Sequence, residues 1–391
     1  MNMKKYKLGD LLSEFHAGKA IQTENIKNKG AYPVYGGNGQ RGYTDSYNQD
    51  GEYLIIGRQG AYCGNVRYNI GKAYLTEHAI VGQTRENHNP IYIALKLSLM
   101  KLSQLQGQSA QPGLSVNTLS CISMEMPPKE IQDKIADIML KLDRKIELNR
   151  QINDNLEAMA KQLYDYWFVQ FDFPNEDGKP YKSSGGAMVY NEKMKREIPQ
   201  GWHCGTLLDI AEYTNGLACQ KYRPTDNNKL PVIKIKEMHD GLSADTEWVK
   251  ADIPNDVKVF DGDVLFSWSA SLEVMLWAYG NGGLNQHIFK VTSKNGYPRS
   301  FYFYQLIHYV GIFKQMAEAR KTTMGHITQD HLKQSTIALP PNVDIANKLE
   351  EKLCPIFDEI VKNNQEIMAL TKQRDELLPL LMNGQASVNS D

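Results

Sequence analysis

The sequence predicts an α+β fold with two globular domains of curved β-sheet and two long antiparallel coiled-coil helices, related by a pseudo-two-fold. Three observations support this prediction. The chain repeats itself with a period of roughly 210 residues, a length that indicates a duplicated domain and not a solenoid. Each copy ends at a double proline, at residues 127–128 and 340–341. A long heptad pattern of apolar residues follows each double proline.

The repeat consists of short matches that occur in the same order in both halves. Residues 8–12 (LGDLL) match 204–208 (CGTLL), 51–56 (GEYLII) match 262–267 (GDVLFS), and 75–80 (LTEHAI) match 284–289 (LNQHIF). Each match alone is weak. Together with the double prolines they make four matches at similar spacing, which chance does not readily produce.

The segments before each double proline are predicted to be mixed in secondary structure. Short β-rich runs at 53–56, 232–235 and 264–268 are separated by turns rich in Gly, Asn and Asp. Helical patterns follow at 91–101 and 302–317. These alternations predict two α+β domains with strongly curved strands.

The two long helices are predicted from apolar residues at alternating steps of three and four. The first seam contains Ile135 and Leu142 and, after a shift of phase, Ile152, Leu156 and Leu163; the second contains Ile356, Ile360, Ile367, Leu370 and Leu377. Asn149 and Asn363 fall at corresponding points, where a polar residue can fix the register of two helices. A mutual antiparallel pair is expected, although each helix could instead pack on its own domain.

These patterns divide the chain into six segments. Two globular domains are expected at 1–126 and 201–339, and the two helices at 127–172 and 340–385. A connector at 173–200 is rich in Pro, Gly, Ser and Asp, which indicates little core of its own. Residues 386–391 read as a frayed tail.

The composition is typical of a soluble globular protein. Of the 391 residues 41% are apolar and 23% are charged, and no apolar run is long enough to cross a bilayer. The N-terminus lacks an apolar segment after its basic residues, so a signal peptide is not expected. The five cysteines are scattered and form no C-x-x-C pair, which favours reduced thiols in the cytoplasm and disfavours structural zinc. The net charge of −1 combines net positive globular segments with net negative helical ones, so basic faces are possible.

Motifs of catalysis are missing from the sequence. It contains no phosphate-binding G-x-x-x-x-G-K-[ST] loop, which disfavours an ATPase. The double prolines are followed by Lys129 and Asn342, not by the aromatic residue that the amino-methyltransferase tetrapeptide requires. A chain without a catalytic centre of its own is therefore expected.

The chain resembles the specificity subunits of type I restriction–modification systems over nearly its whole length. The connector at 171–186 with its continuation through 188–202, and the junctions of double proline and helix, resemble that family most specifically. Segments 32–39 and 57–62 resemble its first target recognition domain. The resemblance implies two target recognition domains, each reading one half of a bipartite double-stranded DNA target.

The resemblance also implies partners and cofactors. Two modification subunits would dock along the helices, bind S-adenosylmethionine and flip the target adenine. Two restriction subunits with motor and nuclease activity, using ATP and Mg²⁺, are a further possibility. These cofactors would belong to the partners, and none is expected in this chain.

Residues suited to base edges and phosphates cluster in predicted loops of the first domain. Arg suits guanine, and Asn or Gln suits adenine. A glycine-rich turn holds Asn38, Gln40 and Arg41, and the loop after an apolar strand holds Arg58, Gln59 and Tyr62. The alternative is that these are ordinary exposed polar residues of turns.

The second domain offers a less uniform set of candidate DNA contacts. Lys234 and Lys236 are expected to alternate along a strand and so to face one side, although they could form a solvated edge. The remaining candidates are Lys221, Tyr222 and Arg223 before a turn, Trp268, Ser269 and Ser271 at the position of the Arg58 loop, and Arg320 and Lys321 as a phosphate clamp. His78 and His287 recur in the repeat. Without further ligands at metal spacing, they are expected to be buried and to hydrogen-bond a turn.

Three functions remain in competition. A DNA specificity subunit is favoured, and its target should be asymmetric because the two domains differ in nearly all candidate contact residues. A coiled-coil adaptor that binds proteins would show no DNA affinity that falls steeply with salt. A self-sufficient nuclease or methyltransferase is disfavoured by the missing motifs.

Overall fold

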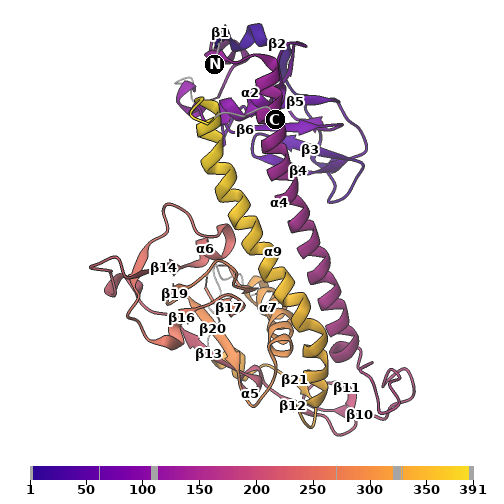
Figure 1. The fold of residues 1–391 in the computed structure, drawn as a ribbon. Helices are drawn as coiled ribbons and strands as arrows, with labels where there is room; N and C mark the ends of the chain where they lie inside the picture. Colours follow the sequence, from indigo (N-terminus) through magenta and orange to yellow (C-terminus); the bar gives the residue numbers. More distant parts are fainter. Residues whose placement is uncertain are drawn as a thin grey trace. The chain divides into compact units, whose positions relative to one another are not determined.

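A computed structural model describes residues 3–60, 62–106, 113–269, 271–319, 327 and 329–386. The chain divides into two compact units (Figure 1). The first unit comprises Met1–Lys145 and Leu370–Asp391, and the second comprises Ile146–Ala369. Each of the two long helices therefore contributes to both units. The six-segment division of the sequence remains a prediction.

The first unit contains two small β-sheets and a strand pair. The larger sheet has the order β2 (Leu12–Ala17), β8 (Ala79–Thr84), β5 (Glu52–Gly57) and β6 (Val66–Ile70), with all neighbours antiparallel. The smaller sheet has the order β4 (Gly39–Thr44), β3 (Tyr32–Gly36) and β7 (Tyr74–Leu75), with β3 and β7 parallel. Strand β1 (Lys4–Lys7) pairs with β9 (Ser123–Met126), just before the double proline.

The second unit repeats this topology. One sheet has the order β13 (Ala211–Asn215), β20 (Ile288–Ser293), β17 (Val264–Ser267) and β18 (Glu273–Leu276). The other, also four-stranded, has the order β15 (Trp248–Lys250), β14 (Lys229–Ile233), β19 (Gly282–Leu284) and β16 (Lys258–Val259), with β14 and β19 again parallel. Strand β12 (His203–Gly205) pairs with β21 (Ile337–Leu339) before the second double proline. The repeat seen in the sequence is therefore a structural duplication.

Each unit has its own apolar core. In the first unit, Leu8, Leu54 and Ile56 are fully buried with the apolar helix α2 (Pro90–Ser98). In the second unit an aromatic cluster joins the end of the first long helix to the connector and to helix α7 (Arg299–Ala319). Its members are Tyr164, Trp167, Phe168, Phe171, Phe173, Trp202 and Phe301. The connector is therefore anchored by its aromatic residues, although its composition predicts little core.

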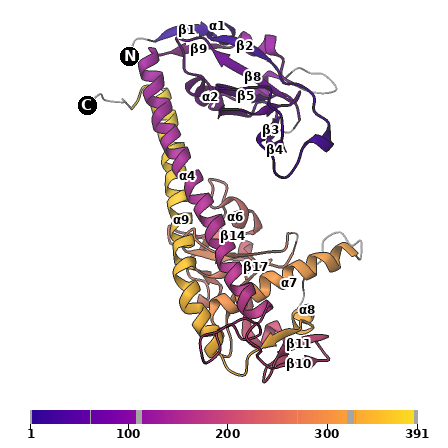
Figure 2. The ribbon, with the colours of Figure 1, turned by 90° about the vertical axis from the view of Figure 1, so that its right-hand side faces the viewer.

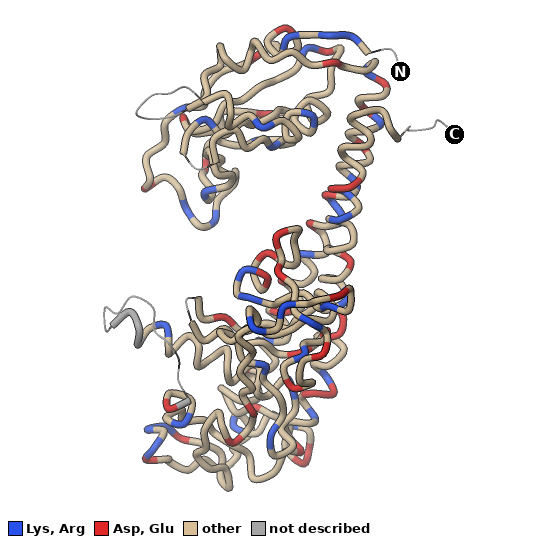
Figure 3. Tube along the Cα trace, turned by 90° about the vertical axis from the view of Figure 1, so that its left-hand side faces the viewer, with Lys and Arg blue, Asp and Glu red and all other residues tan. Residues whose placement is uncertain are grey.

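Both predicted long helices form, and the fold class is confirmed. Helix α4 spans Lys129–Tyr164 and continues into a π-helical turn at Asp165–Val169, and α9 spans Asp344–Met382. Figures 1 and 2 show the two helices side by side. Acidic and basic residues are interspersed along them (Figure 3), as in the i,i+4 pair of Lys141 with Asp137. No helix within the described residues is both long and apolar enough to cross a membrane.

The predicted shift of phase in the first seam is wrong. The buried line on α4 passes through Ile135, Met139, Ile146, Asn149, Asn153 and Ala160, which keep one heptad register throughout. Ile152 lies off this line and is 37% exposed. Leu156 and Leu163 follow Leu142 by two and three whole heptads, so they keep its register and only Ile152 leaves the line. Its neighbour Asn153 is the residue at the seam, a position that a search for apolar residues alone passes over.

The other seam residues lie where the heptad places them. Ile135 and Ile360 are buried, whereas the remaining ones are half-buried: Leu142, Leu156, Leu163, Ile356, Ile367, Leu370 and Leu377. In the second unit Asn149 donates to Glu366 at 2.7 Å, and Asn153 contacts Asn363 and Asn364. The residue numbers of the partners on α9 fall as those on α4 rise, which shows that the two helices run antiparallel here. In the first unit Arg374 of α9 donates to Asp143 of α4 at 3.0 Å.

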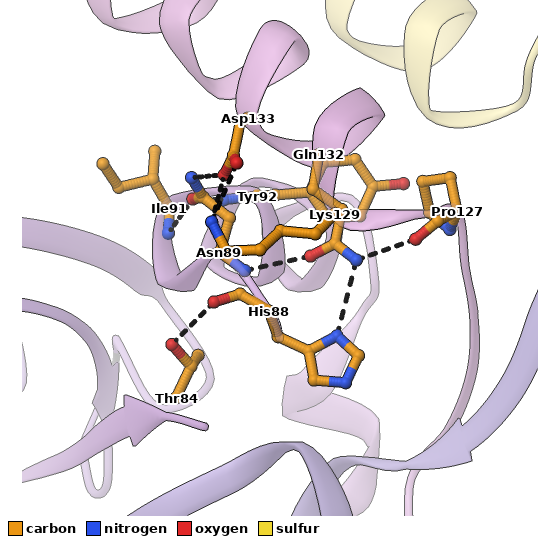
Figure 4. A network of polar contacts seen from close by, with 9 residues as sticks. All are labelled: Thr84, His88, Asn89, Ile91, Tyr92, Pro127, Lys129, Gln132 and Asp133. Carbon is orange, nitrogen blue, oxygen red and sulfur yellow. Dashed lines mark hydrogen bonds and ion pairs between the residues drawn. The ribbon is translucent and has the colours of Figure 1, made fainter. Parts of the chain in front are cut away.

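A polar network ties helix α2 to the start of α4 within the first unit (Figure 4). Asn89 caps α2 by accepting hydrogen bonds from the backbone N–H groups of Ile91 and Tyr92. Its side-chain amide donates to Asp133 at 2.8 Å, and its backbone N–H donates to Gln132 at 3.0 Å. The start of helix α4 is thus attached to the sheet-bearing part of the first unit by directional bonds as well as by apolar packing.

Candidate nucleic-acid interface

Three loops of the first unit converge at one end of its strands. They are the β3–β4 turn, the β5–β6 loop that begins at Arg58, and the β7–β8 loop that ends at His78. The backbone N–H of Arg58 donates to the His78 carbonyl at 2.9 Å. A Cβ on Gly37 would lie 3.1 Å from the His78 carbonyl oxygen and 3.2 Å from that of Gln59. The turn therefore packs against both other loops, and a residue without a side chain permits this.

The candidate residues of the first domain gather around this junction. Asn38 and Gln40 are exposed on either side of Gly39, and the Arg41 side chain lies against Gly36. Gln59 contacts the His78 ring at 3.3 Å. Tyr62 is exposed in the same loop as Arg58. Six candidates from two separate segments of the sequence thus lie around one junction, four of them in loops. Gln40 and Arg41, expected in the turn, instead belong to strand β4.

The expectation that the repeated histidines are buried is wrong. The side chain of His78 is 45% exposed and lies 3.2 Å from the Glu77 carboxylate, and His287 is also exposed. The hydrogen bond between His78 and a neighbouring loop does exist. In both copies the backbone carbonyl of the histidine, and not its ring, accepts a hydrogen bond from the backbone of the adjacent loop. Within the described residues no group of three or more His, Cys, Asp or Glu could hold a metal ion.

The second unit builds the same junction from different side chains. The backbone N–H of Trp268 donates to the His287 carbonyl at 3.3 Å, as Arg58 does to His78. Ile327 donates to the Trp268 carbonyl at 3.0 Å, as Leu114 does to that of Arg58 at 2.9 Å. The Trp268 indole N–H donates to the Asn215 side chain at 3.2 Å. Trp268 therefore stands where the first unit has Arg58.

The prediction that Lys234 and Lys236 alternate along a strand is wrong. Strand β14 ends at Ile233, Lys234 precedes the short helix α6 (Ile235–Asp240), and Lys236 lies within it. Lys234 pairs with Glu247 at 2.5 Å, and this bond lowers the pKa of the glutamate carboxyl. Lys236 lies 3.9 Å from Asp245. Strand alternation failed because the chain turns into a helix, and both ammonium groups have carboxylate partners.

The other candidates of the second unit are dispersed. Ser269 is buried, and Ser271 contacts His239 at 3.0 Å. Lys221, Tyr222 and Arg223 lie at a short 3₁₀ turn beside β15, where the Lys250 ammonium stacks on the Tyr222 ring at 5.5 Å. Arg320 and Lys321 lie outside the described residues. Among the described candidates of the second unit, Trp268 is thus the one that lies at the loop junction.

Sequence reasoning missed two groups at these junctions. Arg67 of β6 reaches the β3–β4 turn of the first unit, and Asn215 at the end of β13 holds Trp268 in the second. Both residues belong to strands in which the sequence shows no pattern typical of a DNA contact. The pairing of Arg67 with Ile55 across β5 and β6 brings it to the junction, and no local pattern reveals that pairing.

Together the duplicated sheets, the antiparallel helix pair and the polar loop junctions define a two-domain recognition protein. The family described as type I restriction modification DNA specificity domain matches residues 1–158 and again 199–372. The chain therefore belongs to the type I restriction–modification specificity family. Membership makes it a DNA specificity subunit, a class of subunit that is not itself catalytic.

Individual relatives agree with this assignment. The specificity subunit of the type I restriction enzyme MjaIX from Methanocaldococcus jannaschii is 27% identical over 383 residues, which cover 88% of this chain and 84% of that subunit. The EcoprrI specificity subunit of Escherichia coli is 41% identical over 144 residues, or 36% of each chain. The crystal structure of a type I S subunit from M. genitalium shares the fold with a TM-score of 0.64 at 14% identity, over 97% of this chain and 96% of that one.

Proposed function

We propose that this chain reads a bipartite, asymmetric double-stranded DNA target, with each domain contacting one half through its loop junction. The observation that carries the proposal is the equivalence of two backbone contacts, Arg58 with His78 and Trp268 with His287. The scaffold of the junction is the same in both copies, while the side chains that it presents differ. A duplicated frame with different side chains suits the reading of two different half-sites.

The chemistry of the two junctions supports asymmetry. The first presents Arg41, Arg58 and the amides of Asn38 and Gln40. The second presents an indole held by Asn215, with His287 at a ring distance of 5.6 Å. Guanidinium groups and amides donate to base edges, whereas an indole offers an apolar face with one N–H. A perfect palindrome should therefore satisfy only one domain well.

The partners are part of the same proposal. Two modification subunits dock along the helices and supply S-adenosylmethionine, and restriction subunits, where present, supply ATP and Mg²⁺ chemistry. Helix α4 offers a surface for docking within the second unit. Leu148, Ile152 and Met159 are 50%, 37% and 58% exposed at steps of four and seven, which places them on one face. An apolar stripe on a helix is the usual means of binding another helix.

The test is methylation mapping. The chain is co-expressed with candidate modification subunits in a host without methylation, and modified adenines are read across the genome. The expected result is one two-part asymmetric motif that disappears when this chain is omitted. An intact complex that produces no motif would overturn the proposal in favour of a protein-binding adaptor.

A further inference from the structure

Arg67 has a built environment at the loop junction of the first unit. It extends from β6, and its guanidinium donates to the Asn38 carbonyl at 3.3 Å. A Cβ on Gly39 would lie only 2.5 Å from the Arg67 Nη1 atom. Gly39 also has a φ of +102°, a backbone conformation that residues with side chains rarely adopt. The turn thus leaves room for the arginine and fixes its head group by a carbonyl.

Two more arginines surround the same turn. The Arg41 Cδ atom lies 2.8 Å from where a Cβ on Gly36 would stand. Arg58 donates to the Glu77 carbonyl at 3.4 Å, on the loop that packs against Gly37. Arg41, Arg58 and Arg67 come from three different segments. We call these three residues the arginine triad.

None of the three guanidinium groups forms an ion pair with a carboxylate in the part of the chain that the structure describes. The Glu77 backbone carbonyl accepts from Arg58, but the Glu77 carboxylate lies 3.2 Å from the His78 ring. Elsewhere arginines are paired, as Arg374 is with Asp143 and Arg299 with Asp358. Like charges gathered without counterions raise the free energy of a surface unless an anion neutralises them.

We propose that the arginine triad contacts DNA in the half-site of the first domain, and that Arg67 is a binding residue of this site. The proposal rests on the proposed function, which supplies the polyanion. Guanidinium donors match both the O6 and N7 acceptors of guanine and the phosphate oxygens. A head group held by a backbone carbonyl loses less conformational entropy on binding than a free side chain. The second domain has Trp268 at the position of Arg58, so the triad belongs to one half-site alone.

The experiment compares Arg67→Ala, Arg67→Lys and Arg85→Ala in the complex with modification subunits. Binding to a duplex that carries the mapped target is measured over a series of salt concentrations. Arg85 is a matched control: it is exposed in the same unit, and it also donates to a backbone carbonyl, that of Asp10 at 3.1 Å. It follows Thr84 at the far end of β8 from His78, about 20 Å along the strand.

Arg67→Ala should weaken binding roughly 5- to 150-fold, whereas Arg85→Ala should leave it unchanged. A loss concentrated at one base pair and not restored by lysine would show contact with guanine. A loss of affinity that is the same for all sequences would show contact with phosphate. In that case the slope of log affinity against log salt should be shallower by about one, and lysine should restore part of the affinity. Either pattern supports the proposal. Affinity and salt dependence equal to those of Arg85→Ala would overturn it.

The outcome also separates this inference from the function on which it rests. A wild-type complex that binds no duplex specifically contradicts the proposed function. A wild-type complex that binds specifically, together with an Arg67→Ala complex that binds equally well, contradicts the triad alone. Thermal unfolding of each variant, expected to match the wild type because Arg67 is exposed, excludes loss of fold as the cause.

Discussion

Asn363 of α9 donates a hydrogen bond to the side-chain oxygen of Asn153 on α4 at 2.9 Å, and both side chains are buried. Asn153 in turn donates to Asn364 at 2.9 Å and to the Ile360 carbonyl at 3.3 Å. The seam of the second unit is thus closed by amides where a coiled coil normally has aliphatic residues. Such a polar layer fits only one register, because any shift leaves buried amides without partners.

Replacing one of these asparagines should cost more than replacing both. Asn153→Leu leaves the Asn363 amide buried and unpaired, which should lower the free energy of unfolding by about 1–3 kcal/mol. The double variant Asn153→Leu/Asn363→Leu should recover much of that loss, since two apolar residues pack well at a seam. Denaturant unfolding of the three proteins checks this. Additive losses in the double variant would show that the two amides do not act as a pair.

Replacing either of two glycines at equivalent points of the repeat should lower the stability of the protein. A Cβ on Gly18 would lie 2.3 Å from the Leu75 carbonyl oxygen, and one on Gly216 would lie 2.3 Å from that of Asn285. Backbone atoms cannot move aside as side chains do, so each alanine variant should lose about 1–3 kcal/mol of stability. Thermal unfolding measures the loss.

Gly311→Ala is the control for these two variants. Gly311 lies in α7, and a Cβ there would have no atom of the described residues within 4 Å outside its own stretch of helix. Alanine should therefore be neutral at this position or stabilising by about 0.5–1 kcal/mol. Gly18→Ala and Gly216→Ala proteins as stable as Gly311→Ala would show that the close approach carries no cost.

The exposed stripe on α4 should be required for binding the modification subunit. Ile152→Asp/Met159→Asp places two charges on a face that is already exposed, so the isolated chain should fold normally. Co-purification with the modification subunit should be lost, because burying unpaired carboxylates opposes docking. Val189→Asp, at an exposed apolar residue of β10 (Met188–Asn191), should leave co-purification intact. Retention of the subunit by the double variant would exclude the stripe as the docking face.

His88 should make the stability of the first unit depend on pH. Burial, and then the nearby Lys129 ammonium, lower the pKa of His88, whose ring lies 3.4 Å from the Gln132 amide (Figure 4). A lowered pKa in the folded state means that folding favours the neutral ring. Its stabilising contribution is present above the unfolded pKa of about 6.5 and is lost as pH falls through the lowered folded value.

Unfolding of the wild type and of His88→Gln at pH about 7.5 and about 5.5 measures this contribution. The wild type should lose more stability between the two pH values than the variant does. Equal losses would show that other groups, and not His88, account for the acid sensitivity.

The sequence by itself determined the duplication, the two long helices, the junctions at the double prolines and the family. These features depend on residues close together in the sequence. Matched short segments, heptads and turn residues indicate them without knowledge of the tertiary contacts. The sequence also placed Asn38, Arg58 and Trp268 correctly in loops, whereas Arg41 lies in strand β4. Turn composition indicates loops without knowledge of the partners of those loops.

Tertiary structure alone decided the rest. The phase of the α4 seam depends on Asn149 and Asn153 finding partners on α9, which makes polar residues as fit for burial as apolar ones. The ion pair that occupies the Lys234 ammonium depends on Glu247, which lies on a different segment. Arg67 joins the loop junction only because β6 pairs with β5 and because Gly39, which has no side chain, leaves room for its guanidinium. Each of these outcomes is a contact between residues distant in sequence, and such a contact leaves no periodic or compositional pattern in the chain.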